Sequence, residues 1–377
     1  MTADAAINNG QDGMKRILTL DGWRGIAILL VLAEHAGWEH FQHQTWAGLG
    51  SLGVDIFFVL SGYIITARLI EEQEKTSTIG LSSFYVRRAF RILPVVGCYL
   101  GVLLGLSLWL PMDIHPAQIA GSLLFFRNYQ YAAQPAGVYT AQFWSLSIEE
   151  HFYLLWPLLL LRFGKRPGVW IAGIGAGLCG LWRYYDITHP EGAIGRWLPG
   201  AASGLRTLRT DARLDGLLLG CLLAILLTRP LVHEWILRNF PKETPLLCAT
   251  LLVMNEQRVN ACAAFSDYIL ITLMIASTLV VQEGLAYKWL NSRLLVWIGT
   301  ISYSLYVWQQ VFLLHPEGGH PLGMLGVFPY NLICAFGLAW CSYRFIERPV
   351  AKLAKHLTGA WNFFRVGRTV ACEIASR

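Results

Sequence analysis

The stretch LDGWRGIAILLVLAEHAG, residues 20–37, is apolar along most of its length but carries Arg24, Glu34 and His35. A helix needs about 20 predominantly apolar residues to cross the hydrocarbon core of a membrane. Ionisable side chains at that depth are costly, so they mark either the end of a span or a functional site. This stretch therefore predicts a membrane helix and raises the question of what its polar groups do.

The composition of the whole chain fits the same class of protein. Of its 377 residues, 55% are hydrophobic, 13% are aromatic and only 14% are charged, whereas a soluble domain has roughly 25% charged residues. Such a chain could not cover a water-soluble surface. We predict an all-α fold, a polytopic helical bundle integral to a membrane.

Recurring apolar runs predict about ten transmembrane helices. They lie near residues 17–37, 51–67, 92–111, 143–161, 168–182, 214–228, 245–256, 268–282, 294–314 and 324–346. A further stretch, 117–126, is bounded by Pro116 and Arg127 and is too short to span.

The distribution of Lys and Arg orients these helices, because cytoplasmic loops are enriched in both residues. The basic clusters share one side if the N-terminus, RFGKRP (162–167) and the C-terminal tail are all cytoplasmic. We therefore expect both termini in the cytoplasm and attribute the net charge of +6 to topology, not to nucleic acid. The arginine-rich stretch 183–213 falls outside, where we expect a functional loop or a re-entrant segment.

Three regions are expected along the chain. Residues 1–14 are polar and lack the apolar core of a signal peptide, so they predict a disordered cytoplasmic tail. Residues 15–350 would form one membrane domain, and 351–377 a basic cytoplasmic tail. The eight cysteines are scattered without a CxxC pair, so we expect no metal site and no disulfide framework.

The topology divides the unusual polar residues into two layers. Arg24 and His35 are eleven residues apart, roughly 16 Å along nearly one helix face, with the histidine nearer the outer surface. The outer layer would also hold carboxylate, hydroxyl and imidazole side chains from the second and fourth spans: Asp55, Ser145, Glu149, Glu150 and His151. These are the elements of general acid–base chemistry.

The inner layer suits a different ligand. Arg88 and Arg91 lie at i and i+3, so both would project from one helix face near the cytoplasm, and forked guanidinium groups suit phosphates. Each feature also has an ordinary interpretation. The histidine and carboxylates could be interfacial, the arginines could set topology, and Ser61, Gly62 and Tyr63, deeper in the second span, could pack helices.

Seven pieces of the chain follow one another in a recognisable order. They are Arg24 with ten residues before His35, GVDIFFVLSGY (53–63), RRAFRILP (87–94), FWSLSIEEHFYLLWP (143–157), RLDGLLLGCLLA (213–224), ISYSLYVWQ (301–309) and IERP (346–349). Together, over roughly residues 17–350, they resemble the acyltransferase-3 family of membrane acyltransferases, which includes bacterial O-antigen and exopolysaccharide O-acetylases and nodulation-factor acylases.

The resemblance implies an integral membrane enzyme that moves an acyl group, usually acetyl, from cytoplasmic acyl-CoA to a hydroxyl of an extracytoplasmic sugar. His35 matches the family's essential histidine and Arg24 its partner. The other matches are the paired arginines of the acyl-CoA side, the serine-glycine-aromatic motif and the serine–glutamate motif: Arg88 and Arg91, Ser61, Gly62 and Tyr63, and Ser145 and Glu149.

The chain departs from the family pattern in three ways. Relatives often have Gln where His151 stands and His where Gln309 stands, which questions a role for position 309. Many relatives also carry a C-terminal SGNH-type esterase-like domain. We expect any acceptor handling by such a domain to come from a separate protein or to be unnecessary here.

In the expected mechanism, His35 deprotonates the acceptor hydroxyl or accepts the acyl group transiently. Asp55 or Glu149 would orient its ring, with Glu150 a weaker candidate, because a base needs a partner to fix its tautomer. Arg24 would lie near the thioester or pantetheine end and stabilise developing negative charge.

No permanently bound cofactor is expected. Acyl-CoA, with acetyl-CoA first, would be a co-substrate, the acceptor a glycan or glycolipid, and the location a bacterial cytoplasmic (inner) membrane. Three alternatives stay open: a proton-coupled transporter, since intramembrane ionisable groups also form proton relays; a catalytically silent scaffold; and an acyltransferase with a lipid, peptide or small-metabolite acceptor.

Overall fold

The computed structural model describes residues 16–36, 48–112, 114–130, 137–189, 208–256, 263–313 and 320–358. Over these ranges the chain is helical and has no strand, which confirms the predicted all-α fold. The tail expected at 1–14 lies outside the described residues. The last helical run continues through residue 350 to residue 358, so the boundary expected at 350 falls within a helix.

The helices differ widely in length. The longer ones are α1 (Leu18–His35), α2 (Leu49–Thr76), α3 (Leu81–Ser107), α6 (Phe143–Phe163), α7 (Lys165–Thr188), α9 (Leu214–Leu226), α11 (Thr244–Glu256), α12 (Ala263–Val280), α14 (Arg293–Trp308) and α16 (Tyr330–Ser342). The shorter ones are α4 (Pro116–Leu123), α5 (Arg127–Gln130), α10 (Pro230–Asn239), α13 (Gly284–Leu290) and α15 (Gln310–Leu313), with the 3-10 turns η4 (Val138–Thr140), η6 (Thr210–Ala212) and η7 (Gly323–Gly326) and the π-helical η8 (Tyr343–Glu347).

Each predicted span coincides with one of these helices or with a helix and its continuation. By length and composition, α2 and α3 could each cross a membrane on their own. Two bent pairs within the described residues, α9 with α10 and α12 with α13, meet the same criterion as single spans, with bends of 104° and 86°. The number of ten crossings and the cytoplasmic position of both termini stay predictions.

The outer face of α7 illustrates the apolar surface of the bundle. Trp170, Ile174, Leu178 and Leu181 follow helical spacing, and each is more than half exposed. A soluble protein rarely leaves such a contiguous apolar stripe in water, whereas a helix that contacts lipid requires one. The fold is therefore that of a helical protein suited to a membrane.

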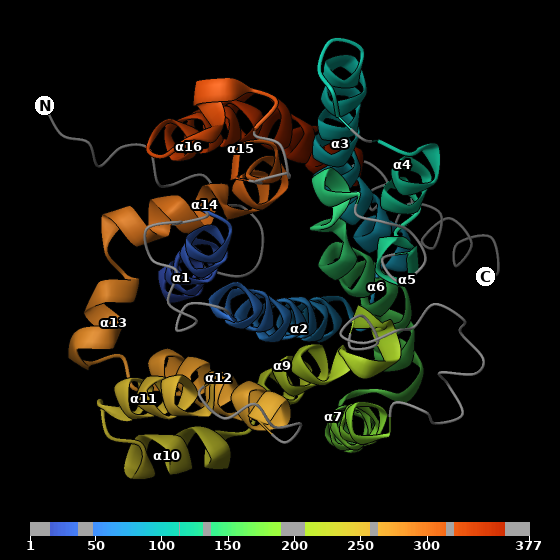
Figure 1. The fold of residues 1–377 in the computed structure, drawn as a ribbon. Coiled ribbons are helices and arrows are strands. Elements are labelled where there is room, and N and C mark those ends of the chain that lie inside the picture. Colours follow the sequence, from blue (N-terminus) through green and yellow to red (C-terminus); the bar gives the residue numbers. More distant parts are fainter. Residues whose placement is uncertain are drawn as a thin grey trace, which may run out of the picture.

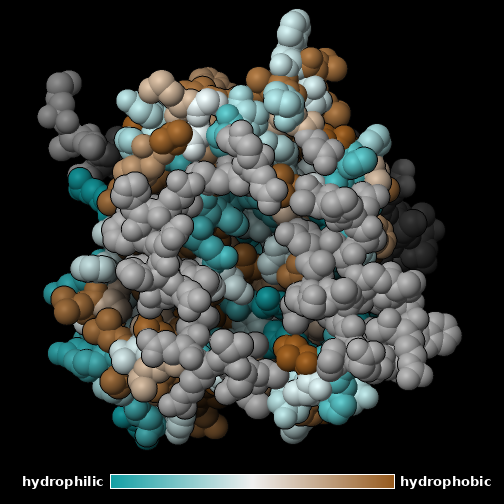
Figure 2. All heavy atoms as spheres, viewed as in Figure 1, coloured by the Kyte–Doolittle hydropathy of each residue, from teal (hydrophilic) through white to brown (hydrophobic). Residues whose placement is uncertain are grey.

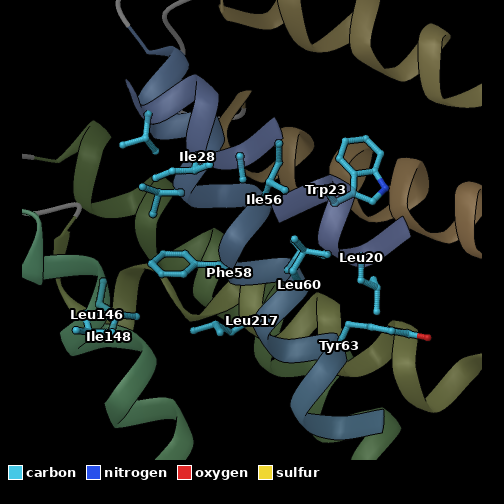
Figure 3. Close-up of a cluster of buried hydrophobic side chains, with 14 of the residues drawn as sticks. Leu20, Trp23, Ile28, Ile56, Phe58, Leu60, Tyr63, Leu146, Ile148 and Leu217 are labelled. Atoms are coloured by element: carbon cyan, nitrogen blue, oxygen red, sulfur yellow. The ribbon is translucent and has the colours of Figure 1, made fainter. Parts of the chain in front are cut away.

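Helices α1 and α2 lie in the middle of the bundle and the others surround them (Figure 1). Helix α1 packs on α2 and α14, α2 packs on α9, and α9 in turn packs on α7. The buried apolar cluster runs through this centre, with side chains from α1, α2, α6 and α9 (Figure 3). The central position of α1 and α2 places their polar residues inside the protein.

Glycines bring these central helices close together. A Cβ on Gly62 of α2 would lie 2.8 Å from the carbonyl carbon of Leu217 on α9, and one on Gly220 of α9 would lie 2.8 Å from the amide nitrogen of Tyr63. Real Cβ atoms do not approach that closely, so only glycine fits at both positions. This is the small-residue packing typical of membrane helices.

Candidate active site

A cavity of about 380 Å³ lies among α1, α2, α3, α6 and α14. Its lining is unusually basic, with five arginines against two carboxylates: Arg16, Arg24, Arg68, Arg88 and Arg91, with Asp21 and Glu149. Hydrophilic residues lie deep between the helices in the face shown in Figure 2. An interior of this charge is suited to an anionic ligand.

Among the residues that the structure describes, four of the five cavity arginines have no carboxylate within ion-pair distance. Arg16 pairs with Asp21 at 2.6 Å. Arg88 stacks its guanidinium 3.7 Å above the Tyr153 ring, and its Nε has no hydrogen-bond partner in the described part of the chain. Because Arg24 and Arg91 also face this space, an anion entering the cavity would meet several guanidinium groups that can still donate hydrogen bonds.

Helix α6 presents one face to the cavity. Ser145, Glu149 and Tyr153 recur every four residues and all line it, as helical periodicity requires. The Glu149 carboxylate accepts hydrogen bonds from Ser61 Oγ at 3.1 Å and from Tyr153 Oη at 2.7 Å. The Ser145 hydroxyl lies 2.5 Å from Tyr306 Oη. The serine–glutamate motif thus joins the arginine layer, not an outer layer with His35 as the sequence suggested.

The serine-glycine-aromatic motif is divided between two roles. Ser61 and Tyr63 line the cavity on α2. Gly62, between them, turns toward α9 and packs against Leu217. The predicted acyl-CoA role of Gly62 is therefore not supported by contact with the cavity, and the alternative of helix packing accounts for this residue.

His35 lies beyond the cavity, at the C-terminal end of α1. Its Nδ1 is 3.1 Å from Oε1 of Gln309, a fully buried residue at the end of α14. The expected orienting carboxylates are engaged elsewhere, Asp55 with α9 and α12 and Glu149 with α2 and α6. The ring is thus held by the amide of Gln309, at a position that departs from the family pattern.

Asp55 belongs to a separate ion-pair network that links α2, α7, α9 and α12. Its carboxylate accepts hydrogen bonds from Arg213 Nη1 at 3.0 Å and from Tyr268 Oη at 2.7 Å. Beside it, the buried Arg183 and Asp215 pair at 2.7 Å. This network does not line the cavity, so the structure separates Asp55 from the other candidate catalytic residues.

The same network explains part of the irregular charge distribution. Arginines of the stretch 183–213 conflict with the positive-inside rule, but Arg183, Arg209 and Arg213 all pair with aspartates. These ion pairs give the three arginines a structural role within the protein, separate from any effect on topology. The loop or re-entrant segment expected here is not tested, because residues 190–207 lie outside the described ranges.

The two other residues assigned to the acceptor side point away from the cavity. His151 Nδ1 lies 2.7 Å from Thr210 Oγ1, and the Glu150 Oε1 atom is buried without a hydrogen-bond partner among the described residues. Neither residue lines the cavity. On α6 they follow Glu149 directly, and one residue is about 100° of helix rotation, so they face other neighbours.

Sequence reasoning missed several residues of the site. Tyr303 and Tyr306 of α14 and Arg68 of α2 line the cavity. Glu347 is buried, accepts a hydrogen bond from Ser304 Oγ at 3.0 Å and interacts electrostatically with Arg24. It lies in the π-helical η8, a local geometry frequent at functional sites. The IERP piece that contains Glu347 was the one available signal.

No three His, Cys, Asp or Glu side chains gather as metal ligands within the described ranges.

Comparison with known proteins gives the same family as the motifs. The O-acetyltransferase OatA of Staphylococcus aureus strain NCTC 8325 is 30% identical over 359 residues, which cover 88% of this chain and 57% of that protein. A protein of S. aureus strain COL is 30% identical over 365 residues, 90% of this chain and 58% of its own length. The chain thus spans less than two thirds of these relatives, and no solved structure matches it. The profile described as an acyltransferase domain matches residues 17–343, and the chain belongs to the acyltransferase-3 family.

Proposed function

We propose that the protein is an O-acyltransferase that transfers an acyl group, with acetyl the first to test, from cytoplasmic acyl-CoA to a hydroxyl of an extracytoplasmic carbohydrate. Family membership and the O-acetyltransferase name of the OatA relative support the reaction class. The observation that carries the donor assignment is the cavity with five arginines and two carboxylates.

The cavity has the charge and size of a donor site. CoA carries phosphate groups, and guanidinium forks bind phosphate through paired, charge-assisted hydrogen bonds. A volume of about 380 Å³ lies at the small end of small-molecule sites. We therefore place the pantetheine arm and thioester inside the cavity and the nucleotide toward Arg68, one of its two exposed arginines with Arg16.

Arg24 and His35 lie too far apart along α1 to act on the same atoms of the donor. Arg24 and His35 are eleven residues apart, roughly 16 Å along the helix, so they do not reach one carbonyl group together. Arg24 is also inside the cavity and His35 is not. We assign Arg24 to holding the donor and His35 to the acceptor hydroxyl, in place of the oxyanion role that the sequence suggested for Arg24.

In this assignment, His35 takes the proton from the acceptor hydroxyl as its oxygen attacks the thioester carbonyl carbon. The carbon–sulfur bond breaks, CoA leaves as the thiolate, and the proton held by His35 is returned to solvent or to the thiolate. The thioester carbon must approach the outer end of the cavity for this step. Among the polar groups that line the cavity, the Tyr306 hydroxyl is nearest in sequence to Gln309, and it lies 2.5 Å from Ser145 Oγ.

The test is acetyl-CoA binding and CoA release by the purified protein in nanodiscs. We expect Arg88→Ala/Arg91→Ala to weaken acetyl-CoA binding at least 10-fold, and His35→Ala to keep binding but lose acceptor-dependent CoA release. Arg238→Ala is the matched control, because that arginine is exposed on α10 and does not line the cavity. If the wild-type protein does not bind acetyl-CoA, the donor assignment is wrong. Release stimulated by a lipid extract and not by a glycan fraction would overturn the carbohydrate acceptor.

A further inference from the structure

The His35 imidazole bonds to Gln309, the first of two consecutive glutamines at the junction of α14 and α15. His35 Nδ1 lies 3.1 Å from Gln309 Oε1, and Gln309 Nε2 lies 3.4 Å from Gln310 Oε1. Gln310 Nε2 lies 2.8 Å from the backbone carbonyl oxygen of Val138. Gln309 is fully buried and Gln310 nearly so. These four residues form one continuous line of hydrogen bonds from η4 to α1.

Donors and acceptors along this line of hydrogen bonds can be arranged in only one way. A backbone carbonyl oxygen accepts and cannot donate, so Gln310 must turn its NH₂ group to Val138 and its oxygen to Gln309. Gln309 then donates its NH₂ group to Gln310 and turns its own oxygen to the imidazole. An amide oxygen also only accepts, so the proton of the neutral His35 ring must lie on Nδ1.

We propose that Gln309, oriented by Gln310, is a positioning residue that fixes His35 in the Nδ1–H tautomer and leaves Nε2 unprotonated for the acceptor hydroxyl. The inference rests on the proposed function for the identity of the substrate, but the tautomer itself does not. A base must present a lone pair toward the proton it removes, and a histidine held in the other tautomer would present a hydrogen.

A neutral partner has a further consequence. A carboxylate in this place would stabilise the imidazolium form, whereas an amide holds the ring without adding a negative charge. The charged group that acts on His35 among the described residues is Glu34, its neighbour on α1, and the α14–α15 side presents the two neutral glutamines. Glu34 itself accepts a hydrogen bond from the backbone amide of Gly50. Replacing Gln309 by Glu would therefore change the charge that His35 meets from this side.

The first measurement needs no turnover. In protein labelled with ¹⁵N-histidine in nanodiscs, the difference spectrum between wild type and His35→Ala reports which ring nitrogen of His35 carries the proton. We expect the Nδ1–H tautomer in wild type and a mixture in Gln309→Leu and in Gln310→Leu. Wild-type His35 protonated on Nε2 would overturn the proposal, whether or not the protein turns over acetyl-CoA.

The second measurement separates positioning from a structural role. We expect Gln309→Leu to lower kcat at least 10-fold with acetyl-CoA affinity changed less than twofold, since Gln309 does not line the cavity. Gln309→Glu should keep activity at high pH but move the acidic limb of the pH–rate profile upward by about one unit or more, because the new carboxylate stabilises the inactive imidazolium.

Gln142→Leu is the matched control, because Gln142 is also buried and donates to the backbone of α14, at Val307, without touching His35. Equal losses of kcat in Gln309→Leu and Gln142→Leu, with no shift of the pH profile in Gln309→Glu, would show that Gln309 only packs. Absence of acetyl-CoA binding in wild type would instead refute the proposed function and leave the tautomer result standing.

Discussion

Replacement of Gly62 by alanine tests whether the serine-glycine-aromatic motif packs helices or binds the donor. The new Cβ would lie 2.8 Å from the carbonyl carbon of Leu217 and 3.1 Å from its Cα, and closer still to the carbonyl oxygen. Ordinary contacts begin at 3.4 Å, so α2 and α9 would have to separate by at least 0.6 Å, the difference between 3.4 and 2.8 Å. Gly220 holds the same two helices together a turn away, so the separation cannot stay local.

The loss in free energy of unfolding expected for Gly62→Ala follows from the packing of α2 against α9. Overpacking of a well-packed interior costs about 1–3 kcal/mol, against which alanine gains roughly 0.5–1 kcal/mol of helix stability over glycine. Gly97 of α3 is the control, because a Cβ there meets nothing within 4 Å and the same gain applies without the clash. Gly62→Ala should thus be about 1–3 kcal/mol less stable than Gly97→Ala. At about 2 °C per kcal/mol, the two melting temperatures should differ by roughly 2–6 °C.

The assay is thermal unfolding of both variants in the same detergent, followed by intrinsic tryptophan fluorescence, with acetyl-CoA affinity measured well below the transition. We expect Gly62→Ala to melt lower than Gly97→Ala and to bind acetyl-CoA as wild type does. The packing argument is refuted if the two variants melt together while Gly62→Ala alone loses affinity. That result would return Gly62 to the donor site.

Three further changes probe the cavity and the ion-pair network. Glu149→Gln should leave acetyl-CoA binding as tight as in wild type or tighter, since it removes negative charge beside the arginines of the cavity; titration with acetyl-CoA measures this affinity. Asp55→Asn should destabilise the protein by about 3–5 kcal/mol, because it removes the carboxylate from the largely buried ion pair with Arg213, whereas Tyr268→Phe should cost about 1 kcal/mol; thermal unfolding compares them. Arg88→Lys should weaken acetyl-CoA binding about 10-fold, or about 1.4 kcal/mol, because lysine keeps the charge but loses the fork and the ring stacking.

Each of these expectations has a contrary result. Weaker donor binding in Glu149→Gln would mean that the carboxylate contacts the donor directly. Equal stability of Asp55→Asn and Tyr268→Phe would mean that the ion pair of Asp55 with Arg213 contributes no more than the neutral hydrogen bond from Tyr268. Full acetyl-CoA affinity in Arg88→Lys would show that the guanidinium geometry plays no part in donor binding.

The sequence by itself determined the class of fold and the residues worth examining. Apolar runs of sufficient length are local in the chain, so the helices coincide with the predicted spans, from α1 to the stretch ending in η8. The spacing of Arg88 and Arg91, and of Ser145 and Glu149, is likewise a property of a single helix. Each of these pairs therefore lies on one helix face in the structure, as periodicity predicts.

The tertiary structure alone decided which polar groups meet. Asp55 and Glu149 looked equivalent as partners of His35, yet one bonds to Arg213 and Tyr268 and the other to Ser61 and Tyr153. Gln309, whose departure from the family pattern questioned any role, holds the histidine from 274 residues away. Periodicity fixes the face of a residue on its own helix, but not the helix that the face meets. That choice depends on close approaches such as Gly62 to Leu217, where backbone packing between distant segments sets the position and rotation of every helix around the cavity.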